Sequence, residues 1–209
     1  MPGFRLYTAL APILALVTAP MVSAQSGGRF EEAKRQGLLY VKNFSFDKAA
    51  GKLEEVWEQD KSDPAVAENL ALAYLNGADR DSHPEIEGKA VALMERSLAM
   101  GGRATFLVVH SHEKLGFIQG RRSSSFCTGF LTVAKGRLSF TSQSKEKPSE
   151  HTFDLSPSGM VELRVHTDNK EGAFYVKTRE KTFNFLPRNW SPRDAQTISN
   201  ITNKYLSTN

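Results

Sequence analysis

Three histidines and one cysteine supply the residue types best suited to chemistry in this chain. His110 and His112 are two residues apart, so in an extended strand their side chains lie on one face. Cys127, the only cysteine, and His151 fall in neighbouring predicted strands. Imidazole nitrogen and thiolate sulfur are preferred zinc ligands, so these four residues form a candidate metal site. The alternative is one core histidine, two surface histidines, and Cys127 as a small buried strand residue.

Catalysis has no other candidate residues in the sequence. Nucleophilic catalysis requires a nucleophile, a base and an orienting group, and the serines at 123–125 are not part of a Gly-x-Ser-x-Gly turn. The sequence also lacks a Walker-type phosphate loop, a dinucleotide fingerprint and a His-Glu-x-x-His helix. We therefore expect a protein that is not an enzyme and that uses no cofactor.

A predicted loop between residues 113 and 126 carries three cations, Lys114, Arg121 and Arg122, the last two beside three serines. Guanidinium groups bind phosphate and carboxylate oxygens through paired hydrogen bonds. The loop could therefore bind an anionic lipid or surface. The alternative is a solvated basic loop without a ligand.

The N-terminus predicts export. Arg5 precedes an apolar run, which is followed by small residues that lead to Ala24. A short positive start, a hydrophobic centre and small residues before the cut are typical of a secretory signal. We expect residues 1–24 to be removed, leaving a periplasmic or secreted protein with no membrane span. The alternative is an uncleaved anchor, although two prolines interrupt the run.

The rest of the chain divides into two halves by charge and by pattern. Residues 25–102 hold 10 Lys and Arg against 14 Asp and Glu, whereas residues 103–209 hold 16 against 9. The apolar spacing changes from helical to alternating at the same point, which is typical of a domain border. We expect a helical domain over residues 28–102 and a β domain over residues 103–209. The basic charge of the β half is spread over loops, so we expect no nucleic-acid partner.

Helical spacing of apolar residues between positions 30 and 100 predicts four helices. Asp63-Pro64 predicts a helix start and Asn76-Gly77 a helix end. Gly37 and Tyr40 recur as Ala71 and Tyr74, 34 residues later, which is the tetratricopeptide period. The small residues of the second helices in each pair are Ala49 and Ala90.

These residues resemble two degenerate tetratricopeptide hairpins. The resemblance implies that the first helix of each hairpin lines a concave groove for a protein or peptide, with Tyr40, Asn69 and Tyr74 as contact residues. Solenoids usually need about three repeats to be stable, so we expect the helices to pack against the β domain or a partner. A plain helical bundle is the alternative.

The second half predicts seven strands separated by turn residues, then a helix that begins with Ser191-Pro192. The predicted strands are 105–110, 127–134, 137–143, 151–155, 160–167, 173–177 and 182–186. The chain is thus predicted to be an α+β protein.

Residues 129–142 resemble the core of the GRAM family, with a strand that begins at Gly129, a tight turn and a Leu-x-Phe strand ending in Ser142. Seven short antiparallel strands closed by one helix resemble the pleckstrin-homology superfold. The resemblance implies an antiparallel barrel or sandwich capped by the C-terminal helix. Eukaryotic relatives bind inositol phosphates after the first strand, but their phosphate motif is not reproduced here, so the resemblance does not imply that ligand.

Three hypotheses follow for the function. The first is an exported adaptor in which tetratricopeptide-like helices and a pleckstrin-homology-like domain bind a protein or peptide. The second is binding of an anionic lipid or surface by the basic loop. The third is a metal-binding protein that uses the histidines and Cys127.

Overall fold

The computed structural model describes residues 22–78, 80, 83–111, 126–143, 152–165 and 172–206. Residues 1–21 of the predicted signal lie outside these ranges. The three cations of the predicted anion-binding loop lie outside them as well. Within the described ranges, no helix combines the length and the apolar character that crossing a bilayer requires.

In the described part of the N-terminal half there are four helices, as the apolar spacing predicts. They are α1 (Val22–Lys42), α2 (Phe46–Gln59), α3 (Pro64–Asn76) and α4 (Glu85–Ala99). The start of α3 is confirmed, because the Asp63 carboxylate accepts hydrogen bonds from the backbone N–H groups of Ala65 and Val66, with a proline in the first turn. The predicted end of α3 at Asn76 is also confirmed.

Small residues let these helices approach each other closely. A Cβ atom at Gly37 of α1 would lie 2.7 Å from two side-chain carbons of Leu53 in α2, which is closer than real Cβ atoms come. Ala49, Ala71 and Ala90 are completely buried. These positions therefore need small side chains because of helix packing, whichever family the helices belong to.

Seven antiparallel strands form one sheet in the order β4-β3-β2-β1-β7-β6-β5. They are β1 (Arg103–Ser111), β2 (Phe126–Ala134), β3 (Arg137–Ser142), β4 (Phe153–Leu155), β5 (Met160–Val165), β6 (Phe174–Thr178) and β7 (Thr182–Pro187), with a short 3-10 turn, η5 (Pro157–Gly159), before β5. Gly136 has φ of 67° in the turn between β2 and β3, as expected of the predicted hairpin. The last strand, β7, pairs with the first, which joins the two meanders into a single sheet.

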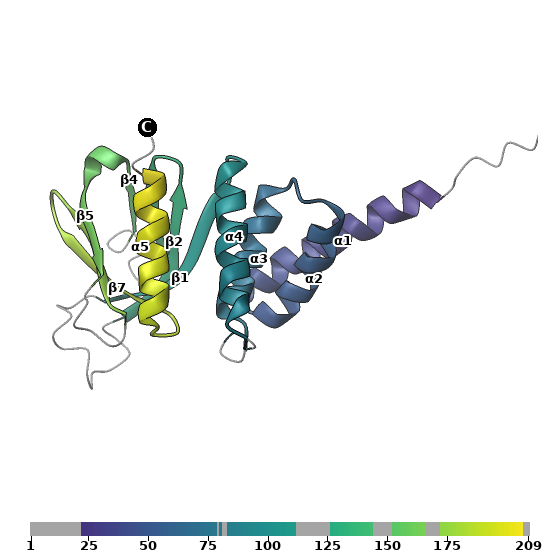
Figure 1. Cartoon of the computed structure of the whole chain (residues 1–209), viewed down its shortest axis with the longest axis horizontal. Helices are drawn as coiled ribbons and strands as arrows, with labels where there is room; N and C mark the ends of the chain where they lie inside the picture. The colour runs from purple at the N-terminus through teal and green to yellow at the C-terminus, as the bar shows by residue number, and fades with distance from the viewer. Residues whose placement is uncertain are drawn as a thin grey trace, which may run out of the picture.

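The helix α5 (Pro192–Leu206) follows β7 and packs on the sheet, in contact with β2, β3, β5 and β7 (Figure 1). Its buried apolar side chains are Ala195, Ile198, Ile201 and Leu206. The predicted fold class is therefore confirmed: an α+β chain of four helices, then a seven-stranded antiparallel sheet covered by a C-terminal helix. The strand number, the antiparallel order and the final helix are consistent with a pleckstrin-homology-like arrangement.

Aromatic side chains from several strands pack against one another in the core beside the sheet. The ring centroids of Phe153 and Phe183 are 4.5 Å apart, and those of Phe140 and Phe185 are 5.0 Å apart. Phe174 is completely buried beside them. Such tilted and edge-on contacts add to the stabilisation that comes from burying apolar area.

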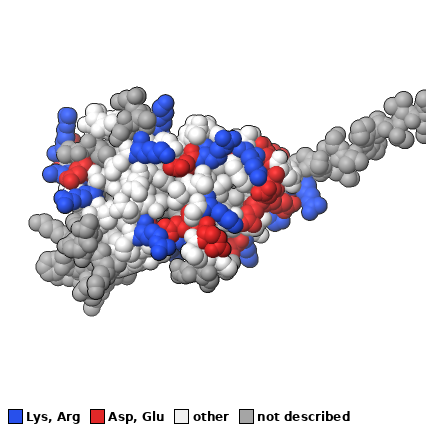
Figure 2. Space-filling view, viewed as in Figure 1, with Lys and Arg blue, Asp and Glu red and all other residues white. Residues whose placement is uncertain are grey.

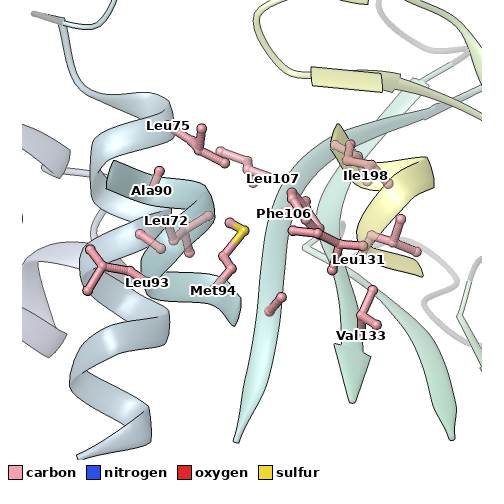
Figure 3. Packing of buried hydrophobic residues seen from close by; sticks show 14 of the residues in the cluster. Leu72, Leu75, Ala90, Leu93, Met94, Phe106, Leu107, Leu131, Val133 and Ile198 are labelled. Carbon is pink, nitrogen blue, oxygen red and sulfur yellow. The ribbon is translucent and has the colours of Figure 1, made fainter. Parts of the chain in front are cut away.

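The strand β1 is buried on both faces, which explains its nearly continuous apolar sequence. Figure 3 shows Leu75 of α3 and Leu107 of β1 facing each other, whereas Phe106 points away from the helices towards Ile198 of α5. β7 pairs only with the second half of β1, from Val108 onwards, and both α3 and α4 contact β1. The expectation that the helices pack against the β half is therefore confirmed.

Polar bonds cross the same junction. Glu68 of α3, only 5% exposed, accepts hydrogen bonds from Arg103 Nε at 3.1 Å and from the Thr105 hydroxyl. Arg80, between α3 and α4, donates both of its Nη groups to the carboxylate of Asp194 at the start of α5. Both members of this pair are buried, so the helical and β halves are joined by a shared apolar core and by buried charges.

Two further ion pairs link α4 to α5. Arg193 Nη1 lies 3.3 Å from Glu87, and Lys204 Nζ lies 2.6 Å from Glu95. Because the pairs join the beginnings and the ends of the two helices, α4 and α5 run in the same direction. Glu87 and Glu95 of α4 are therefore already paired with cations of α5.

Candidate partner-binding site

The helix α2 has two different faces. Phe46, Ala49, Leu53 and Val56 are buried in the core at helical spacing. The adjoining face carries Asp47, Ala50, Gly51, Glu54, Trp57 and Glu58, which line two adjoining cavities. The amphipathic pattern of α2 therefore leaves this second face open beside α3 and α4.

The two cavities have volumes of about 390 and 250 Å³ and share Glu54 and Tyr74. Since they adjoin, we treat them as one groove, called the α2–α4 groove below. The α2 wall carries Asp47, Glu54, Trp57 and Glu58, the α3 floor Leu70 and Tyr74, and the α4 wall Ile86, Lys89, Ala92, Leu93 and Arg96. The floor is the middle helix, and its two neighbours are the walls.

The two walls of the larger cavity carry opposite charges. Glu54 and Glu58 lie on the α2 side, and Lys89 and Arg96 on the α4 side. Figure 2 shows acidic side chains gathered over the α1–α2 end of the molecule, with basic and acidic side chains mixed towards α4. Within the described part of the chain, neither cation forms an ion pair or a side-chain hydrogen bond. The α4 wall thus offers two cations, of which Lys89 has only a through-space attraction to Glu85, one turn earlier on the same helix.

Tyr74 connects the floor to the acidic wall. Its hydroxyl donates a hydrogen bond to Glu54 Oε1 at 2.5 Å. Burial, and then the neighbouring carboxylate, raise the pKa of Tyr74 above its ordinary value. The phenol therefore stays neutral at physiological pH and remains a hydrogen-bond donor where the two cavities meet.

Trp57 is the largest apolar side chain that lines the groove. Its indole is partly buried against the core and also lines the larger cavity, together with Leu70 and Leu93. Tryptophan side chains at the centre of an interface often carry much of the binding energy. The groove thus combines an apolar centre with charged edges, as protein interfaces do.

The three predicted contact residues are not brought together. Tyr74 lies in the groove, but Tyr40 of α1 instead has Lys48 Nζ at 6.0 Å from its ring centroid. Asn69 donates a hydrogen bond from Nδ2 to the carbonyl of Ala65 in its own helix, at 2.8 Å, and does not line either cavity. The groove lies on the side of the second helices, α2 and α4, rather than on the side of α1.

Sequence reasoning did not single out Trp57, Glu58, Lys89 or Arg96. The helical spacing of Phe46, Leu53 and Trp57 predicts an apolar helix face, which accounts for only half of the environment of Trp57. The available signal was the three- and four-residue spacing of Glu54, Trp57 and Glu58 on the face of α2 beside its core residues. The facing wall comes from α4 because α2 and α4 both pack on α3. Local sequence patterns do not predict this packing.

Two of the four candidate metal ligands are described, and they are neighbours as predicted. His110 and Cys127 are directly paired in β1 and β2, with Cys127 Sγ 3.5 Å from His110 Nδ1. The His110 ring lies 5.2 to 5.9 Å from the rings of Phe140, Phe183 and Phe185. Burial raises the pKa of the Cys127 thiol. This environment is an aromatic core.

The remaining candidates, His112, His151, Lys114, Arg121 and Arg122, lie outside the described residues. Within the described ranges, no group of three or more histidine, cysteine or acidic side chains is arranged to hold a metal ion. The metal and anion hypotheses therefore remain predictions from the sequence.

Comparisons with known proteins identify no family: no family model and no curated protein matches this chain. One similar solved structure is the C-terminal domain of an unknown protein from Leishmania infantum, with TM-score 0.33 and 18% identity over 64% of this chain and 99% of that one. Another is an N-terminally truncated structure of the linker-DH/PH domains of p115-RhoGEF, with TM-score 0.35 and 8% identity over 78% of this chain and 57% of that one. At these TM-scores and identities neither likeness indicates a function. What the molecule itself defines is an α+β protein whose helical layer, braced by a sheet, carries an open groove.

Proposed function

We propose that this protein is an exported, non-catalytic binding protein that holds a segment of another protein in the α2–α4 groove. The observation that carries the proposal is the groove itself, with an apolar centre at Trp57, Leu70 and Leu93 between walls of opposite charge. The cations Lys89 and Arg96 on the α4 wall favour a partner that brings its own carboxylates.

The β half serves in this proposal as a brace for the groove. The shared core at Leu75 and Leu107 and the buried Arg80–Asp194 pair support a fixed geometry for α3 and α4. A preformed site loses less conformational entropy on binding than a flexible one. We assign the two parts to tetratricopeptide-like hairpins and a pleckstrin-homology-like domain. The 34-residue spacing of Gly37 and Ala71, and the strand order, support this assignment.

A peptide-display selection on the purified protein tests the groove as a binding site. Ala92 is exposed on the α4 wall, so Ala92→Arg places a long side chain in the groove without changing a buried residue. Ala99→Arg, two turns further along α4 and outside the groove lining, is the matched control. Circular dichroism spectra establish that both variants are folded.

The proposal predicts that selected peptides bind the wild type and the Ala99→Arg variant with equal affinity. Their affinity for Ala92→Arg should fall at least tenfold, because one long charged side chain would occupy the space that the peptide needs. Peptides that bind all three proteins equally well would place the binding surface elsewhere and reject the proposal.

A further inference from the structure

We infer that the partner segment is an amphipathic helix with one basic edge and one acidic edge. This inference rests on the proposed function, since it concerns the same groove, and it adds the conformation and the charge pattern of the occupant. Three features of the groove carry it: its length, the direction of its walls and the placement of its charges.

The groove has the dimensions of a site for a helix. Asp47 and Ile86 line one cavity and Glu58 and Arg96 the other, so the walls α2 and α4 run in the same direction. The α2 wall extends from Asp47 to Glu58, about 16 Å or three turns at 1.5 Å per residue. A helix that lies between α2 and α4, above α3, would complete a layer of packed helices.

Each wall offers charges at helical intervals. Glu54 and Glu58 are one turn apart, and Lys89 and Arg96 are two turns apart on the opposite wall. A guest helix therefore matches the groove when it carries cations four residues apart along one edge and carboxylates seven residues apart along the other.

A helix fits this arrangement better than an extended strand. Successive side chains of a strand alternate between two opposite directions, so they would point towards the floor and towards solvent. An amphipathic helix turns an apolar stripe towards the floor and presents charged residues along both sides of that stripe. Only the helix meets Trp57 and both charged walls at once.

Four designed 16-residue peptides test the inference against the purified protein by fluorescence anisotropy. All share one apolar stripe with three- and four-residue spacing. The dipolar peptide has Lys on one edge and Glu on the other, two others have Lys or Glu on both edges, and the last is the dipolar peptide with a central proline. We expect the dipolar peptide to bind about tenfold more tightly than the other three, with a smaller difference at high salt.

A charge reversal on the α2 wall identifies which charges of the groove contribute to peptide binding. Glu58→Lys should weaken the dipolar peptide about fivefold, because it removes an attraction and adds a repulsion at the edge of the site. The same variant should strengthen binding of the peptide with Glu on both edges. Glu55→Lys, on α2 but outside the groove lining, is the matched control and should leave both affinities unchanged.

The outcomes separate the two proposals. If display-selected peptides require an open groove but the proline-containing or uniformly charged peptides bind as tightly as the dipolar one, the helical, two-edged partner is wrong and the groove remains a binding site. If Ala92→Arg has no effect on any peptide, the proposed function is rejected as well. Tightest binding by the dipolar peptide, weakened by Glu58→Lys alone, would support the inference.

Discussion

Replacement of Asp194 by alanine should destabilise the whole protein, because it leaves a buried guanidinium without its main partner. Arg80 is 8% exposed and donates both of its Nη groups to the Asp194 carboxylate. The two residues are 114 positions apart and join the α3–α4 connection to α5. The pair therefore ties the helical half to the β half.

The size of the effect follows from burial. Removal of one member of a buried ion pair typically costs about 3–5 kcal/mol. Arg80 would keep a hydrogen bond to the Leu75 carbonyl at 3.0 Å and a carboxylate of Glu87 at 3.7 Å, so we expect about 3 kcal/mol, at the lower end. The control is Asp154→Ala, which breaks the similarly paired but exposed bond to Arg137 and should leave the free energy of unfolding nearly unchanged.

Urea denaturation followed by circular dichroism measures both free energies of unfolding. With a slope of about 2 kcal/mol per molar urea, the midpoint for Asp194→Ala should fall by roughly 1.5 M, whereas that for Asp154→Ala should scarcely move. The double variant Arg80→Met/Asp194→Leu should lose less than the single variant, since no unpaired charge remains buried. Equal losses for the two aspartate variants would refute the reasoning.

Four further predictions concern separate features. Gly37→Ala should lower the free energy of unfolding by about 1–3 kcal/mol because its Cβ has no room, whereas Gly51→Ala, with open space around it, should raise it by about 0.5–1 kcal/mol in the same urea assay. The raised pKa of Tyr74 adds stability that is complete below its ordinary pKa of 10.0 and is lost as the pH rises above it, so Tyr74→Phe should lose less stability than the wild type in alkaline titrations. Mass spectrometry of protein from the culture medium or periplasm should find a chain that starts after Ala24, and an intact N-terminus would contradict the signal prediction. Metal analysis of protein purified without chelator should find zinc only at trace level, because His110 lies in an aromatic core; stoichiometric zinc would instead support the metal hypothesis.

Local signals in the sequence were sufficient for most of the fold. Asp63 caps α3 with its own carboxylate, and Gly136 permits the turn between β2 and β3, so both boundaries depend on residues within a few positions. Where the predicted strand starts and ends fall on described residues, they agree with the structure to within about two residues for the same reason. The predicted start at 151 and the predicted end at 167 lie outside the described residues. The buried aromatic faces of the strands follow from their alternating pattern.

The groove and the junction depend on contacts between distant segments, which local patterns do not specify. Glu58 and Arg96 face each other only because α2 and α4 pack on either side of α3. Arg80 and Asp194 form their ion pair although 114 positions separate them in the sequence. The tetratricopeptide resemblance implied that the first helix of each hairpin, α1 and α3, lines the binding site. It did not predict a groove between the second helices, α2 and α4.

Site-specific photo-crosslinking tests the central claim most directly. A photoreactive residue placed at Ala92 lies on the wall of the α2–α4 groove, and the same residue at Ala99 lies outside the groove lining. With a display-selected peptide bound, we predict adducts from position 92 and not from position 99. Adducts from position 99 alone, or equally from both, would contradict the assignment of the groove as the binding site.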